Sequence, residues 1–255
     1  TRPASLTIQG LQAAPVGGPV RLSLERRAVA GKPVVRASLD SSAGVLPVWA
    51  VGAFVPALGA AGRGALFSGF VEWEQGAVHS RGAARGELRG VDLAKVFPAN
   101  SPCRAEGHAQ ASLAQLQWSD GQVELLQGAI RAEDVRVSRS LLDAAATRLL
   151  CGVAPLGSGP PEELVPVAKL AARFEFRPQG ITLWGDFPSV AQLPEGCLAL
   201  GLTGALVLQP QHRLLPVGCW VQFAAGPSGN WMPATREGVQ IASGLPLPPA
   251  ETAHK

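Results

Sequence analysis

The amino-acid sequence predicts a mainly β protein: an elongated antiparallel sheet of repeated hairpins with one or two short helices. Its 255 residues include 30 glycines and 22 prolines, a density of chain breakers that disfavours a helical bundle and favours short strands joined by turns. Several segments alternate apolar and polar residues, and one strand–turn–strand pattern recurs. The sheet could be an open half-pipe or resemble a β-sandwich. Alternation of apolar and polar residues shows that one face of a strand is buried, but it does not show whether a second sheet or another layer covers that face.

Alternating residues mark the first strands. Residues 21–25, 35–39 and 67–73 alternate apolar with polar side chains, which is the period of a half-buried strand. In the third of these segments Phe67 and Trp73 fall on one face, and glutamates lie mostly opposite. We therefore expect a strand in each of these segments.

Two later segments show the same alternation. One places Ser112, Leu116 and Trp118 on one face and Leu113 on the other. In the other, phenylalanines alternate with charged residues before Pro-Gln-Gly at residues 178–180, and a second alternating segment follows. Pro at the second position and Gly at the fourth suit a type I turn, so this segment is predicted to be a hairpin.

A repeated unit organises the chain. Residues 71–78 resemble residues 116–123, since each has a strand, a Trp-x-x-Gly turn and a returning strand. Residues 176–181 form a looser third copy with Phe in place of Trp. Repeated units of this kind bury their faces against one another and stack into long sheets, although three ordinary hairpins would look alike.

One helix is predicted between these regions. Ser140 is placed to cap a helix over residues 141–151, with an aspartate at the capping-box position, and Gly152 is placed to end it. A second short helix is expected to start near Glu162. Between the two helices lies a loop of glycines, serine and prolines at residues 157–161.

That loop suggests two portions. Residues 1–156 would hold the repeated strand–turn–strand region and the helix. Residues 157–255 would form a second β-rich portion, with a hairpin near residues 170–185 and a proline-rich tail. One continuous domain is the alternative.

An uncharged stretch occupies residues 41–62, but its prolines and glycines do not suit a spanning helix. Within it, residues 45–59 could form a short buried helix or apolar loop, or touch lipid at a bilayer surface. The chain shows no secretory leader, and it could be a mature product or a piece of a longer protein.

No catalytic constellation is visible, so we expect a protein that is not an enzyme. The chain lacks a GxSxG elbow, a P-loop and an HExxH motif. Glu72 and Glu74 lie two residues apart, which places both on one strand face, whereas paired-carboxylate catalysis needs acids facing each other across a cleft. The four cysteines are too far apart in sequence for a zinc site, so no metal and no cofactor are expected. A net charge of +3 is too small to indicate a nucleic-acid partner.

Residues 82–93, 107–113 and 118–121 show a spacing of glycine, leucine and aspartate residues that is similar to that of a known family. The first contains Gly-Glu-Leu-Arg-Gly-Val-Asp-Leu, and the last is Trp-Ser-Asp-Gly. This resembles the AsmA-like proteins of the bacterial envelope, relatives of the translocation-and-assembly subunit TamB. They show "G-x-L-x-G-V-D-L", then "G-x-A-x-x-x-L", then a "W-x-D-G" hairpin. The resemblance covers about residues 65–187.

The resemblance implies a function. Such proteins are typically anchored at the inner membrane and project a β-sheet half-pipe across the periplasm. It implies that this chain is periplasmic or in the cell envelope, as part of a membrane-anchored protein. There it would bind or conduct phospholipid or another apolar ligand, or support outer-membrane assembly, with membrane-surface contact and envelope protein partners. The candidate groove residues are Phe67, Val71, Trp73, Leu116, Trp118, Phe174, Phe176, Ile181 and Leu183. The alternative is a β-sandwich module that binds a glycan or a partner protein in the envelope.

Overall fold

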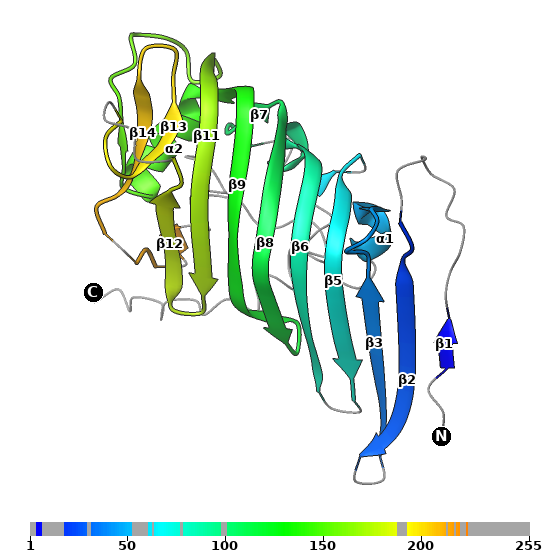
Figure 1. The fold of residues 1–255 in the computed structure, drawn as a ribbon. Helices are drawn as coiled ribbons and strands as arrows, with labels where there is room; N and C mark the ends of the chain where they lie inside the picture. The colour runs from blue at the N-terminus through cyan, green and yellow to red at the C-terminus, as the bar shows by residue number, and fades with distance from the viewer. Residues whose placement is uncertain are drawn as a thin grey trace, which may run out of the picture.

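Most of the chain forms one sheet. The computed structural model describes residues 4–6, 18–29, 32–52, 61–62, 64–76, 79–97, 101–187, 193–212, 214–216, 218–219 and 223. Within these residues, fourteen strands join in one antiparallel sheet (Figure 1). The ends of the sheet are β1 (Ala4–Leu6) and β10 (Cys151–Val153), so it is open and is not closed into a barrel. The predicted elongated antiparallel sheet is confirmed.

Seven long strands form the body of the sheet, and each pairs with the next in this series along the chain. They are β2 (Arg21–Val29), β3 (Lys32–Asp40), β5 (Leu66–Gln75), β6 (Ser80–Asp92), β8 (His108–Ser119), β9 (Gln122–Ser138) and β11 (Leu164–Arg177). Strands β9 and β11 lie on either side of the loop at residues 157–161 and pair along most of their length. Whether the chain is best divided into two portions there stays a prediction.

Short strands extend the edges of the long ones. They are β4 (Leu46–Pro47) on β5, β7 (Ala105–Glu106) on β9, and β12 (Gly180–Gly185) on β11, followed by β13 (Cys197–Leu200) and β14 (Ala205–Pro210). Strand β12 pairs with the second half of β11, while β13 pairs with Lys169 and Leu170 nearer its start. The sheet therefore divides in two along the far edge of β11.

The hairpin turns follow from their residues. Asp120 and Gly121 join β8 to β9 with φ of 51° and 78°, the left-handed conformations that an Asp-Gly hairpin turn adopts. Pro178 and Gln179 join β11 to β12, whose flanking residues Arg177 and Gly180 pair directly. Both hairpins therefore lie where the sequence predicts them.

The two faces of the sheet differ in chemistry. Residues that pair directly across neighbouring strands point to the same face. One such row crosses eight strands and is apolar throughout: Leu22, Leu39, Val71, Ala84, Leu116, Leu126, Phe176 and Ile181. The opposite face has charged and polar residues, among them Arg36, Glu72 and Arg173. Below, these are called the apolar face and the polar face.

Helices cover one part of the apolar face. Helix α1 (Val48–Gly52) buries Val48 and Val51, and α2 (Arg139–Arg148) buries Leu142 in the same core cluster as Phe67. A 3-10 turn, η2 (Leu93–Lys95), adds Leu93. Figure 1 shows α1 beside β3 and β5, and α2 near β11, β13 and β14. The prediction of a short buried helix is confirmed for residues 48–52, while residues 53–60 lie outside the described residues.

A bulge corrects the predicted face of one strand. Pairing in β8 shifts register between Leu113 and Gln115, so Leu113 pairs with Gly86 and Leu116 pairs with Ala84. Leu113 is buried and shares the apolar face with Leu116, while Ser112 pairs with Glu87. The prediction that Ser112 shares the face of Leu116 is wrong, because the extra residue of a bulge inverts the alternation beyond it.

The helix boundaries also differ from the prediction. Ser138, not Ser140, is the N-cap of α2, and its hydroxyl accepts from the Leu141 amide at 3.3 Å. The Ser140 hydroxyl instead donates to the Pro102 carbonyl at 2.5 Å. The helix ends at Arg148 and Leu150 takes a positive φ of 55°, so Gly152 lies in β10 and does not end the helix.

The predicted second helix is absent from the described chain. Residues 161–162 form a turn, and β11 begins at Leu164. The physical reason is that Ser138 to Val135 on β9 offer backbone partners to Leu164 through Val167. Pro166, which would interrupt a helix, is tolerated in this ladder.

Candidate functional site

All nine predicted groove residues lie on the apolar face. Direct pairs link them, for example Phe174 with Leu183 and Phe176 with Ile181. Burial then separates them into two groups. Phe67, Val71, Leu116 and Ile181 are buried, whereas Trp73, Trp118, Phe174, Phe176 and Leu183 are partly buried. These last five residues are called the aromatic strip below.

Glycines allow the rings of the strip to lie against the sheet. Gly82 pairs with Trp73 on one side and with Trp118 on the other. A Cβ at Gly82 would come within 2.0 Å of Trp118 Cζ2, so the indole covers the glycine backbone. In the same way, a Cβ at Gly128 would come within 2.8 Å of Phe174 Cζ. The rings thus cover backbone that no side chain shields.

Two further residues of this surface were not predicted. Leu126 pairs with Leu116 and Phe176, and Ile130 pairs with Ala172; both are partly buried against the core. Leu125 and Leu126 are adjacent, so alternation alone does not show which one faces the core. The pairing of β8 with β9 shifts register between Gln117 and Trp118. Because of this shift Leu126 pairs with Leu116 and lies on the apolar face.

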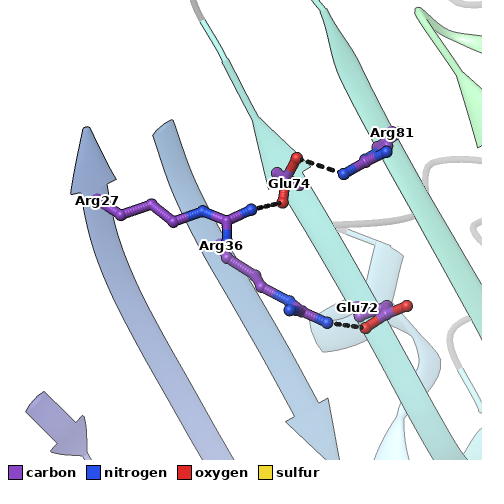
Figure 2. Close-up of polar contacts among 5 residues, drawn as sticks. All are labelled: Arg27, Arg36, Glu72, Glu74 and Arg81. Carbon is purple, nitrogen blue, oxygen red and sulfur yellow. Dashed lines mark hydrogen bonds and ion pairs between the residues drawn. The ribbon is translucent and has the colours of Figure 1, made fainter. Parts of the chain in front are cut away.

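The polar face has a network of ion pairs on its first strands. Glu74 accepts from Arg27 at 2.8 Å and from Arg81 at 2.9 Å, and Glu72 accepts from Arg36 at 2.8 Å (Figure 2). These side chains come from β2, β3, β5 and β6 and line an open depression of about 360 Å³. Each glutamate is paired with arginine, so Glu72 and Glu74 form salt bridges between neighbouring strands on the polar face.

A set of hydrogen bonds joins the turn before β6 to the turn after β8. Asp120 accepts from the Ser80 amide at 2.8 Å and lies 2.9 Å from His79 Nδ1. Its own amide donates to the Ser80 carbonyl at 2.7 Å. The hydrogen bonds from His79 and the Ser80 amide hold the pKa of Asp120 below its ordinary value. The turn after β8 is therefore fixed to the start of β6.

The four thiols are free, and three of them are buried. Burial raises the pKa of Cys151 to about 11, and it also raises the pKa of Cys103 and of Cys197. A protonated, buried thiol is a poor nucleophile. These three cysteines therefore serve as small apolar core residues.

Two further properties concern only the described part of the chain. It contains no group of three His, Cys, Asp or Glu side chains that could hold a metal ion. It also contains no helix long and apolar enough to cross a membrane.

The chain matches no family model, no curated protein and no solved structure. The resemblance to the AsmA-like proteins therefore stays a prediction from the sequence.

Proposed function

We propose that this chain is a non-enzymatic protein of the cell envelope that binds or conducts phospholipid, or another apolar ligand, along the apolar face of its open sheet. The observation that carries the proposal is the aromatic strip. Among the residues that the structure describes, all strands belong to one sheet and no second sheet packs on its apolar face, where these five large side chains are only partly buried. The family resemblance supports the envelope location, membrane anchoring and a role in outer-membrane assembly.

The strip suits an acyl chain in both extent and chemistry. Its residues come from β5, β8, β11 and β12, and apolar pairs connect them across the intervening β6 and β9. Transfer of each methylene group of an acyl chain from water to an apolar surface is favourable by about 0.8 kcal/mol of free energy. A surface spanning several strands can therefore hold a lipid without any specific polar contact.

The division of the apolar face explains how one sheet can both fold and bind. Phe67, Val71 and Leu116 belong to the core cluster together with residues of α1 and α2. That buried part stabilises the sheet without a ligand. Trp73 and Phe176 lie outside this cluster of buried residues, so they are available to a ligand without unfolding the core.

Native mass spectrometry of the purified protein, followed by extraction and identification of lipids, tests the proposal. We expect phospholipid bound in a stoichiometric amount. Trp118→Asp should abolish the bound mass, while Leu202→Asp should retain it, because Leu202 is 77% exposed between β13 and β14, away from the strip. Circular dichroism verifies that each variant is folded.

A second measurement needs no substitution. Phosphatidylcholine with brominated acyl chains quenches nearby tryptophans, so it should quench wild-type fluorescence if lipid lies against Trp73 and Trp118. An apo mass that is unchanged after incubation with liposomes, together with unquenched fluorescence, would refute the lipid proposal.

A further inference from the structure

The polar face contains a second depression, on the opposite side of the sheet from the aromatic strip. It has a volume of about 400 Å³, within the size range of small-ligand sites. Six of its lining residues matter here: Ser112, Gln127, Ala129, Arg173, Glu175 and Trp184. One row of direct pairs runs from Ser112 through Ala129 and Arg173 to Trp184. The small side chain of Ala129 leaves the space between its larger neighbours.

Ion pairs fix the polar groups at this site. Arg173 Nε lies 2.9 Å from Asp186 Oδ1, and Arg131 donates to Asp186 Oδ2 at 2.7 Å. Glu175 accepts from Gln127 at 2.7 Å and is also engaged by Arg177. These hydrogen bonds, from Arg177 first and then Gln127, hold the pKa of Glu175 below its ordinary value. The groups therefore keep their orientation and charge before any ligand arrives.

Each arginine at the site is already paired with a carboxylate, Arg173 and Arg131 with Asp186 and Arg177 with Glu175, and these three arginines and two carboxylates leave a net charge of +1. Asp186 and Glu175 would repel a phosphate or another anion, and Arg173, Arg131 and Arg177 would repel a cation. A neutral ligand with many hydroxyl groups avoids both penalties, since each hydroxyl can donate to Glu175 and accept from Arg173 or Gln127. The Trp184 indole adds a flat apolar surface beside these groups.

We propose that this depression binds a neutral glycan, with one pyranose ring against Trp184 and its hydroxyls on Arg173, Glu175 and Gln127. Phe174 of the aromatic strip also lines the depression, but Trp184, Arg173, Glu175 and Gln127, which would contact the glycan, do not belong to the strip. The glycan proposal therefore does not rest on the lipid proposal, and either can fail without the other. A protein with both sites would hold an apolar ligand on one face and a polysaccharide on the other.

Isothermal titration calorimetry with maltohexaose, cellohexaose, chitohexaose and dextran tests the glycan proposal. We expect saturable binding of at least one of these probes, and a loss of tenfold or more in affinity in Trp184→Ala. Trp49→Ala is the matched control, because Trp49 is 59% exposed on α1, near β4 and β5. Its affinity should equal that of the wild type.

Glu175→Gln provides a second variant in case Trp184→Ala does not fold. It preserves the shape of the side chain but weakens the acceptor, so affinity for the same probe should fall while circular dichroism stays unchanged. Absence of heat with all four probes would overturn the proposal. Equal affinity in the wild type and a folded Trp184→Ala would do so as well.

Discussion

The contact between Trp118 and Gly82 makes a specific prediction about stability. Gly82→Ala places a methyl group 2.0 Å from Trp118 Cζ2, where ordinary contacts begin at 3.4 Å. Because Gly82 also pairs with Trp73, the methyl group is directed into a surface with a ring on either side. The Trp118 indole must therefore swing away from the sheet.

The cost follows from the surface that the indole gives up. A buried tryptophan covers about 200 Å², and loss of a third of that at about 25 cal/mol per Å² costs about 1.7 kcal/mol. Replacing a strand glycine recovers about 0.7 kcal/mol of backbone entropy. We therefore expect Gly82→Ala to lower the free energy of unfolding by about 1 kcal/mol, which corresponds to a Tm lower by roughly 2–4 °C.

Denaturant and thermal unfolding, with two controls, measure this cost. A Cβ at Gly64 meets nothing within 4 Å, so Gly64→Ala should leave stability unchanged or raise it by a few tenths of a kcal/mol. In a Trp118→Leu background, Gly82→Ala should lose its penalty, because the clashing ring is gone. A penalty of equal size in both backgrounds, or stabilisation by Gly82→Ala in the wild type, would refute the ring-over-glycine geometry.

Three other predictions concern charged and titratable groups. Glu74→Gln should lower the free energy of unfolding by about 0.5–1 kcal/mol, and by less in high salt, because Glu74 is 21% exposed and forms ion pairs with two arginines. Glu72→Gln breaks an ion pair with one arginine, so it should lower the free energy of unfolding by less in the same urea titrations. Asp120→Asn keeps the left-handed turn but loses the charge, so its Tm should fall at neutral pH. Because folding lowers the pKa of Asp120, its charge stabilises the folded state above the ordinary aspartate pKa, and this stabilisation is lost in acid. The Tm values of the wild type and of Asp120→Asn should therefore converge in acid. A Tm difference between the two proteins that persists in acid would contradict this. Because the pKa of Cys151 is raised from 9.0 to about 11, the wild type should lose stability as pH rises through that range, and Cys151→Ala should show a weaker pH dependence.

The sequence predicts the strands well because their side chains alternate. Phe67, Val71 and Trp73 on β5 have no interruption, and the structure places them on one face as expected. In β8 the same reasoning reverses between Leu113 and Leu116, because a bulge depends on the partner strand and leaves no mark in local periodicity. Alternation is therefore a sound guide only as far as the nearest register shift.

Capping and burial were harder to predict for a similar reason. Ser138 and Ser140 are both chemically able to cap α2, and the choice depends on Pro102, whose carbonyl takes the Ser140 hydroxyl. Similarly, nothing in the local pattern separates buried Leu116 from partly buried Trp118, since helices remote in sequence decide which part of the face is covered. The depression around Trp184 depends on rows that cross four strands, which a single segment does not reveal.

The sequential pairing of the long strands has a consequence for how such a chain can change in evolution. Each of β2, β3, β5, β6, β8, β9 and β11 pairs with its neighbour in this series along the chain, so most contacts in the body of the sheet are between hairpins close in sequence. Contacts that are local in sequence lower the contact order and favour faster folding. A genetic duplication of one hairpin would then lengthen the sheet without disturbing pairs elsewhere. Each added copy would extend both faces by the same increment.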